Sequence, residues 1–133
     1  MKKNILYLFF SITFFSCDPS TQIIFKIDNR TGVPVQIDFE VNDEKSKLQH
    51  YENLETTIII TANTSTYIID FFEMENTSDY GSDFLKFFKS IKISNVDSTE
   101  INLQYRNREA WKHKVIKSSL TSKVIEYKLV IEE

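Results

Sequence analysis

The chain concentrates residue types that favour binding near its C-terminal end. Its only tryptophan, Trp111, follows a short basic stretch that contains Arg106 and Arg108. Tryptophan and arginine are enriched where proteins bind other proteins, and aromatic rings also stack on sugars. The candidate binding residues are therefore Arg106, Arg108, Trp111 and Tyr105. The alternative is that Trp111 lies in the core and that the bases line an edge strand, where lysine discourages pairing with another chain.

No motif typical of catalysis accompanies these residues. The two histidines, His50 and His113, lie far apart in the sequence, and neither belongs to a motif with the spacing of metal ligands. The chain lacks the Gly-x-Ser-x-Gly nucleophile motif and the zinc-protease helix. With two glycines in all, it has little material for a phosphate-binding loop. We expect a protein that is not an enzyme and that uses no cofactor and no metal.

Five acidic residues between Asp70 and Asp83 follow one another without an intervening base. Calcium binds several oxygen ligands, so a calcium site is one interpretation of this run. The spacing of the acids matches no calcium-binding loop, and the glycine that such a loop requires is not at the right place. A solvated acidic loop is the favoured interpretation.

The single cysteine, Cys17, directly follows an apolar segment at the N-terminus. Two lysines precede residues 5–15, which are too few to span a bilayer core of about 20 helical residues but suit the apolar region of a signal peptide. Phe14-Phe15-Ser16-Cys17 resembles the lipobox of bacterial lipoproteins, with Phe where the usual pattern has Leu and a small residue. We expect residues 1–16 to be a signal peptide and Cys17 to be lipidated. A free thiol is the alternative.

A lipidated Cys17 would hold the mature chain at a membrane, since two or three acyl chains make a stable anchor. Residues 17–22 then comprise the lipidated cysteine and a short tether. No acidic run of the kind that directs some Bacteroidetes lipoproteins to the cell surface follows the cysteine. We therefore expect a lipid anchor in the bacterial cell envelope, at the outer membrane and facing the periplasm.

The charge of the mature chain narrows the choice of partners. Removing residues 1–16 takes away two lysines and leaves 14 basic residues against 19 acidic ones, so the formal net charge changes from −3 to −5. A nucleic-acid-binding domain is usually basic, so nucleic acid is not expected as a partner. The negative balance also argues against a broad electrostatic attraction to anionic lipid.

Alternation with a period of two dominates residues 23–133, which have the length of one domain. Hydrophobic and polar residues alternate in residues 23–28 and again in residues 33–41, where Val33 opens the apolar face. A turn sequence containing Gly32 joins the two segments, and we predict that they form a hairpin. Pro34 suggests that this part of the second strand lies at a sheet edge.

The rest of the chain predicts further short strands and one short helix. Ser82 is a candidate cap for this helix, with Phe84, Phe87 and Phe88 at helical spacing. The further strands are expected at residues 48–54, 56–61, 66–72, 91–93, 101–105, 111–116 and 125–131. This pattern predicts an all-β fold, an antiparallel Ig-like β-sandwich of about seven to nine strands. A barrel is the alternative.

As a whole, the arrangement resembles the small lipoproteins common in Bacteroidetes-type bacteria. These share a short Lys-Lys signal that ends in Ser-Cys, then a strand, an Asn-x-Thr-Gly turn (residues 29–32 here) and a second alternating strand. They often end with a strand such as residues 126–132. The resemblance implies the Ig-like β-sandwich and the envelope location, and it supplies no catalytic residues.

One short motif resembles a modification site of these bacteria. Asp97-Ser98-Thr99 matches the Asp-Ser/Thr-x acceptor for O-glycosylation of exported Bacteroidetes proteins, and it falls in a predicted turn. Ser98 is therefore the candidate glycosylation site.

These observations predict a membrane-anchored lipoprotein that acts as a non-enzymatic protein-interaction module, with another envelope protein as its partner. One alternative is a lipoprotein that binds a carbohydrate or another ligand, with Trp111 and Tyr105 as a stacking platform for a glycan. A further alternative is an immunity or inhibitor lipoprotein of the periplasm, whose negative charge would suit a basic target.

Overall fold

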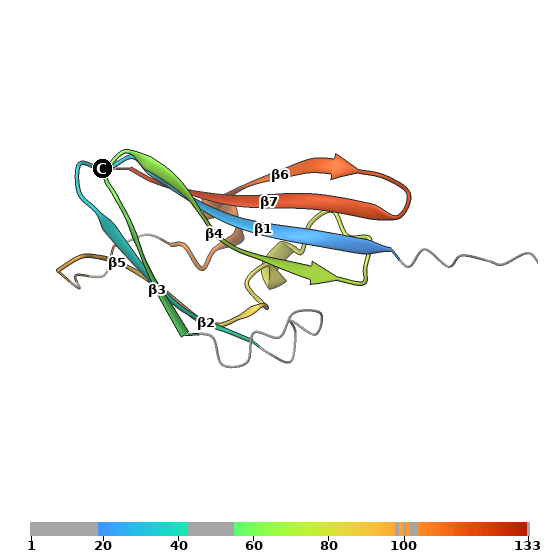
Figure 1. The fold of residues 1–133 in the computed structure, drawn as a ribbon, viewed down its shortest axis with the longest axis horizontal. Helices are drawn as coiled ribbons and strands as arrows, with labels where there is room; N and C mark the ends of the chain where they lie inside the picture. The colour runs from blue at the N-terminus through green and yellow to red at the C-terminus, as the bar shows by residue number, and fades with distance from the viewer. Residues whose placement is uncertain (1–18, 43–54, 98, 100, 102–103, 133) are drawn as a thin grey trace, which may run out of the picture.

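The structure is a computed structural model that describes residues 19–42, 55–97, 99, 101 and 104–132. In these residues it contains seven strands and two short 3-10 turns (Figure 1). The strands are β1 (Ser20–Asn29), β2 (Val35–Val41), β3 (Glu55–Ile60), β4 (Thr64–Glu73), β5 (Phe88–Asn95), β6 (Trp111–Ser118) and β7 (Ser122–Ile131). The 3-10 turns are η1 (Gly81–Asp83) and η2 (Arg108–Ala110).

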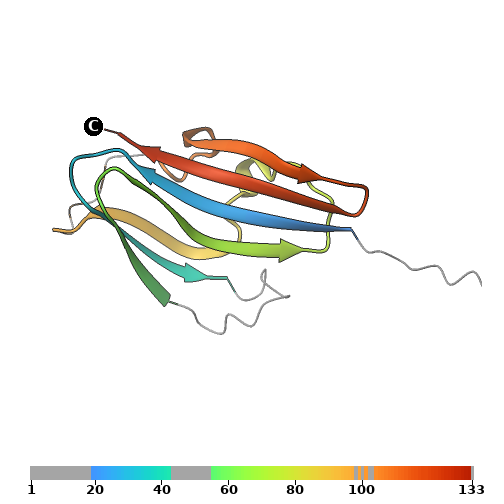
Figure 2. The ribbon, with the colours of Figure 1, turned by 45° about the horizontal axis from the view of Figure 1, so that its top comes forward.

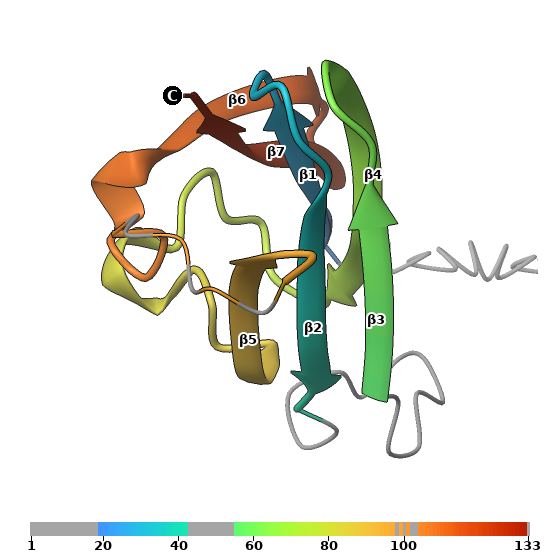
Figure 3. The same ribbon diagram turned by 90° about the vertical axis from the view of Figure 1, so that its left-hand side faces the viewer.

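The strands form two sheets that enclose one apolar core. One sheet has the order β4-β1-β7-β6 and the other the order β3-β2-β5 (Figures 1 and 3). This confirms the expected β-sandwich. All strand pairs are antiparallel except β1 with β7, which run parallel. The strand order differs from that of an antibody constant domain, in which the first strand pairs with the second.

The alternation predicted from the sequence appears directly in the burial of side chains. Along β1, buried and half-buried residues alternate without interruption, and Ile23, Phe25 and Ile27 are fully buried. Phe25 lies at the centre of the core, where its ring packs against the rings of four residues from other elements. These residues are Phe71, Phe88, Trp111 and Tyr127. Burial of these large apolar side chains is the main stabilising contribution to the fold.

The predicted hairpin of the first two strands is wrong, because β1 and β2 belong to different sheets. Alternation shows that each strand has one buried face, and this pattern is equally compatible with pairing or with facing across the core. Residues 30–34 cross from one sheet to the other (Figure 3). Pro34 precedes β2, which is the central strand of its sheet rather than an edge, and Val33 is 48% exposed instead of buried.

Asn29 fastens this crossing. Its side chain is completely buried, and its amide donates hydrogen bonds to the carbonyl oxygens of Val33 at 2.9 Å and Thr61 at 3.1 Å, and also to that of Ile60. Its Oδ1 accepts hydrogen bonds from the backbone N–H and the hydroxyl of Thr31. One amide therefore joins the connection between β1 and β2 to the connection between β3 and β4.

The short helix predicted after Ser82 is also different in the structure. Residues 81–83 form only the 3-10 turn η1, without a side-chain cap, and Phe88 already begins β5. The apolar character of the segment is nevertheless reflected in the core, because Phe84, Phe87 and Phe88 are all buried. They reach the core from a compact turn because the segment is anchored at both ends by strands. This segment and η2 lie on the side of the sandwich away from β3 and β4 (Figure 3).

Of the other predicted strands, those at residues 56–61, 66–72, 91–93, 111–116 and 125–131 coincide with β3, β4, β5, β6 and β7, except that Thr61 lies just beyond β3. The strand predicted at residues 101–105 is wrong for the residues described there, because Ile101 and Tyr105 lie outside any strand. The strand predicted at residues 48–54 lies outside the described residues. In the described part of the chain, no helix is long and apolar enough to cross a membrane.

Candidate functional site

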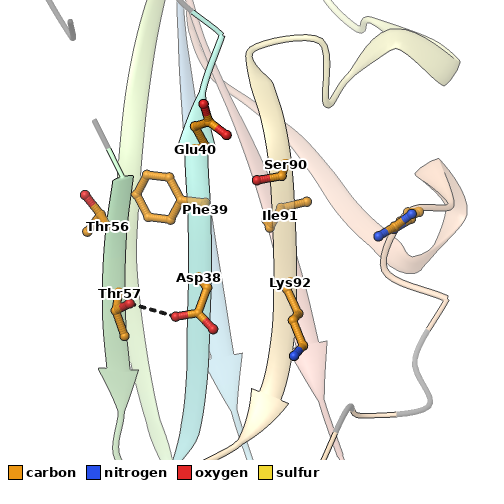
Figure 4. A pocket seen from close by; sticks show the side chains of 9 residues that line it. Asp38, Phe39, Glu40, Thr56, Thr57, Ser90, Ile91 and Lys92 are labelled. Atoms are coloured by element: carbon orange, nitrogen blue, oxygen red, sulfur yellow. Dashed lines mark hydrogen bonds between the residues drawn. The ribbon is translucent and has the colours of Figure 1, made fainter. Parts of the chain in front are cut away.

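A depression of about 620 Å³ lies on the three-stranded sheet, and we call it the β5 groove. Its polar and charged lining comes from all three strands of the sheet and from one residue after β5 (Figure 4). These residues are Asp38, Glu40, Thr57, Ser90, Lys92 and Arg106, together with parts of Phe39, Thr56 and Ile91. A smaller depression of about 270 Å³ shares Ser90, Ile91 and Arg106 with the groove. Arg106 therefore lines both depressions.

Strand register places the polar side chains of the groove in rows. Asp38 of β2 lies opposite Thr57 of β3 and opposite Lys92 of β5. Residues that are directly opposite in antiparallel strands project from the same face of the sheet. Figure 4 shows these three residues side by side across the strands. Glu40 lies two residues further along β2, opposite Ser90, and thus projects from the same face.

The carboxylates of the groove are already engaged by neighbouring side chains. Asp38 accepts a hydrogen bond from the Thr57 hydroxyl at 2.7 Å and two from the Gln36 amide at 3.0 Å. Glu40 forms an ion pair with Lys89. Lys89 therefore balances the charge of Glu40, whereas Asp38 keeps its negative charge and has its oxygens hydrogen-bonded by neutral groups.

The two bases of the described lining, Lys92 and Arg106, are not engaged by carboxylates in this way. Among the described residues, neither Lys92 nor Arg106 forms an ion pair with a carboxylate. The guanidinium of Arg106 lies 5.9 Å from the ring centroid of Tyr105, and both base side chains are exposed. The groove thus offers two cationic hydrogen-bond donors to a ligand from outside.

The described lining of the groove is polar and charged rather than aromatic. Among the described residues of the lining, the one aromatic residue, Phe39, is buried in the core, so it presents no ring face to a sugar. Ser90 is the only serine of this described lining, which includes no histidine or cysteine that could activate it. Charges and hydroxyl groups on a flat, open sheet face are suited to binding the surface of another molecule.

Two of the four candidate binding residues lie in the core. The rings of Trp111 and Tyr105 are each only 2% exposed. The Trp111 indole donates a hydrogen bond to the Tyr105 carbonyl at 2.6 Å, and it packs edge-on against Phe25 and Phe84. The stacking platform proposed from the sequence is therefore wrong, because the first residue of β6 projects into the sandwich.

Arg108, the third candidate, is half-buried, and its guanidinium is engaged by groups of the same chain. Its guanidinium donates to both carboxylate oxygens of Asp79, at 3.0 and 2.9 Å, and to the Trp111 carbonyl at 2.8 Å. It also lies 4.9 Å from the ring centroid of Tyr127. These contacts attach η2 to the loop that precedes η1 and occupy the donors that a ligand would need, so they favour a structural role for Arg108, and its binding role stays a prediction.

Asp79, whose side chain is 42% exposed, is the centre of this hydrogen-bond network. The Tyr127 hydroxyl donates to its Oδ1 at 2.7 Å, and the Gly81 N–H donates to the same oxygen at 3.1 Å. Partial desolvation alone would raise the pKa of Asp79, but the hydrogen bonds from Arg108, Tyr127 and Gly81 outweigh it and hold the pKa well below its ordinary value. Asp79 is therefore a carboxylate at neutral pH. Burial, followed by the hydrogen bond to this carboxylate, raises the pKa of Tyr127.

A second cluster supports the same segment of chain. Lys86 forms an ion pair with Glu73 at 2.7 Å, and its ammonium lies 4.4 Å from the ring centroid of Tyr80. Burial raises the pKa of the Tyr80 hydroxyl, and the negative charge of Glu73 adds to this effect. The cluster ties the end of β4 to the segment before β5.

The acidic residues between Asp70 and Asp83, which suggested a calcium site, include three that interact with separate partners in the structure. Asp70 accepts hydrogen bonds from Gln22 and Tyr67, whereas Glu73 and Asp79 pair with different bases. Among the described residues, no three histidine, cysteine or acidic side chains are grouped so that they could hold a metal ion. Two further predicted sites, Cys17 and Ser98, lie outside the described residues.

The sequence therefore identified only one residue of the β5 groove, Arg106. The other polar residues of the groove come from β2, β3 and β5, and the sequence alone does not show that these strands are neighbours. The available signal was weak: each is the outward-facing member of an alternating strand. Comparisons of the chain with protein-family models, with curated proteins and with solved structures gave no match.

Proposed function

We propose that the chain is the precursor of a lipid-anchored envelope lipoprotein whose β-sandwich acts as a non-enzymatic protein-interaction module. The partner, another envelope protein, binds in the β5 groove. The observation that carries this proposal is the pair of exposed bases, Lys92 and Arg106, that line an open polar groove and have no carboxylate partner among the described residues.

The chemistry of the groove indicates what the partner presents. An arginine guanidinium pairs with a carboxylate through two parallel hydrogen bonds, which fixes orientation as well as affinity. Arg106 is placed for such a pair, and Lys92 adds a second positive charge in the same groove. We infer that the partner inserts a segment with one or two acidic side chains, while Thr57 and Ser90 supply neutral hydrogen-bonding groups.

The N-terminal sequence supports the membrane anchor. Lys2 and Lys3, the short apolar segment and the Ser16-Cys17 pair have the order of a lipoprotein signal. The described fold begins with β1 at Ser20, three residues after Cys17. A lipid on Cys17 would therefore keep the domain close to its membrane, which we place at the periplasmic face of the outer membrane.

The anchor is tested by the intact mass of the protein extracted from membranes. Wild type should have the mass of residues 17–133 plus two or three acyl chains, and Cys17→Ser should lack the acyl mass. An unacylated wild-type protein would contradict the anchor.

The groove is tested by photo-crosslinking in intact envelopes. A photoreactive amino acid at Ser90 should give a specific adduct with a protein partner, and Arg106→Glu should reduce that adduct about tenfold, because it replaces an attractive charge with a repulsive one. Lys26→Glu is the matched control, since Lys26 lies on β1 in the other sheet. An adduct that survives Arg106→Glu, or that Lys26→Glu removes equally, would rule out recognition through the groove.

A further inference from the structure

We propose that the hairpin tip, residues 117–121, contacts the same membrane that holds Cys17, with the Leu120 side chain inserted at the lipid surface. The hairpin tip connects β6 to β7. This inference rests on the proposed lipid anchor and adds to it a second, protein-borne contact that sets the orientation of the domain.

Leu120 is the most exposed large apolar side chain among the described residues, at 96%. The turn that carries it is held by hydrogen bonds from the Ser119 N–H and the Ser119 hydroxyl to the Ser122 carbonyl, at 2.8 and 3.0 Å. The Leu120 side chain is held in water by a hydrogen-bonded turn, so its apolar surface contributes no burial free energy to the fold. Transfer of this side chain to an apolar phase would be favourable and would need little additional ordering of the chain.

The position of the hairpin tip specifies which apolar phase it meets. The Ser20 N–H donates a hydrogen bond to the Thr121 carbonyl at 3.0 Å, so the tip lies beside the first residue of β1. Ser20 is only three residues after Cys17. Even fully extended, they span about 11 Å, at 3.6 Å per residue. A lipid on Cys17 must therefore bring the hairpin tip to the membrane surface.

The same end of the molecule carries further apolar and basic side chains. The start of β1, the end of β4 and the β6–β7 connection lie together at one end, with the C-terminus at the other (Figures 1 and 2). Met74 follows β4 directly and is 51% exposed, and the neighbouring Asn76 amide donates to the Leu120 carbonyl at 3.4 Å. Ile116, near the end of β6, is 50% exposed.

Basic residues flank these apolar side chains. Lys114 and Lys117 of β6 are both exposed, and Lys117 lies two residues before Ser119, where the turn begins. Apolar side chains with adjacent lysines are typical of protein surfaces that lie at the membrane interface, where the ammonium groups reach phosphates while the apolar groups enter the acyl region. The occupant of this surface is therefore a phospholipid bilayer.

The test uses the acylated mature protein in vesicles of phosphatidylethanolamine and phosphatidylglycerol whose acyl chains are brominated. Leu120→Trp places a fluorescent reporter at the hairpin tip, and Val33→Trp places one at the opposite end as the matched control. The native Trp111 is a constant background, because it is buried and lies nine residues from position 120 along an extended strand, about 30 Å away.

We expect brominated lipid to reduce the added fluorescence of Leu120→Trp at least about twofold and to leave that of Val33→Trp nearly unchanged, since bromine quenches only rings at the depth of the acyl chains. The intact mass of each sample establishes acylation independently. Unquenched Leu120→Trp in an acylated sample would overturn this inference and leave the anchor intact, as would equal quenching of both variants. A sample without acyl mass would instead contradict the proposed function and, with it, the premise of this inference.

Discussion

The guanidinium of Arg108 forms two hydrogen bonds with the carboxylate of Asp79, from Nε to Oδ1 at 3.0 Å and from Nη2 to Oδ2 at 2.9 Å. The two residues are 29 positions apart and come from the two irregular segments that flank β5. The Tyr127 hydroxyl of β7 joins the pair at 2.7 Å. The contact therefore holds both segments against the four-stranded sheet and keeps the core covered on that side.

This pair predicts a specific loss of stability in acid. The pKa of Asp79 in the folded protein is below its ordinary value, so the contribution of Asp79 is fully present above about pH 4 and is lost as the pH falls through its folded pKa. Asp79→Asn should therefore lower the melting temperature at neutral pH, and the difference from wild type should shrink towards about pH 2. Thermal unfolding at a series of pH values measures this.

The matched control for this experiment is Asp83→Asn, because Asp83 is exposed in η1 and its carboxylate has no ion pair among the described residues. Its difference from wild type should be small at every pH. A constant difference between Asp79→Asn and wild type from neutral to acidic pH would contradict the assignment of Asp79 as a stabilising carboxylate.

Substitutions of the two arginines of the basic stretch should differ in their effect on stability, since Arg108 is engaged within the fold and Arg106 lies in the groove. Arg108→Ala removes the ion pair with Asp79 and the hydrogen bond to the Trp111 carbonyl. It should cost about 1–2 kcal/mol of unfolding free energy, because Asp79 is partly exposed and keeps its hydrogen bonds from Tyr127 and Gly81. Arg106→Ala removes an exposed side chain and should change that free energy by less than about 0.5 kcal/mol. Urea unfolding followed by Trp111 fluorescence gives both values. Equal losses of unfolding free energy in the two variants would contradict the assignment of Arg108 to a structural role and of Arg106 to an exposed groove.

Asn29 should be one of the most sensitive polar positions. Asn29→Ala leaves the Ile60 carbonyl without the amide donor in a buried setting and removes a part-buried hydrogen bond to the Thr61 carbonyl, for a cost of about 2–3 kcal/mol. Asn29→Asp should be worse, because it places a negative charge against carbonyl oxygens. Denaturant unfolding measures both variants. Asn76→Ala, which removes one exposed hydrogen bond, is the control and should be nearly neutral.

The core predicts a large difference between two phenylalanines. Phe25→Ala removes the ring that packs against four other aromatic residues and should destabilise the protein by about 3–5 kcal/mol. Phe72 projects from the opposite face of its strand and is only half-buried, so Phe72→Ala should cost less than about 1.5 kcal/mol. The comparison uses the free energy of unfolding in urea. A Phe72→Ala loss as large as that of Phe25→Ala would mean that the outer face of this sheet is covered by something that contributes to the fold.

The alternating strands could be predicted because the pattern of a strand with one buried face is local. Ile23, Phe25 and Ile27 could be assigned to the core from their spacing alone, and so could the apolar residues of β7. The partners of a strand are not encoded in the same way. Nothing in residues 23–41 distinguishes a hairpin from two strands that face each other. The crossing is decided by the pairing of β1 with β4 and β7 and of β2 with β3 and β5.

The candidate site shows the same division. The sequence by itself determined that Tyr105, Arg106, Arg108 and Trp111 are grouped within seven residues, and it predicts a lipoprotein signal that ends at Cys17. Only the tertiary structure decided that Trp111 and Tyr105 lie in the core, that Arg108 pairs with Asp79 and that Arg106 lines a groove. The physical reason is that residue type sets what a side chain can bind, whereas its exposure and its partners depend on segments that fold beside it from elsewhere in the chain.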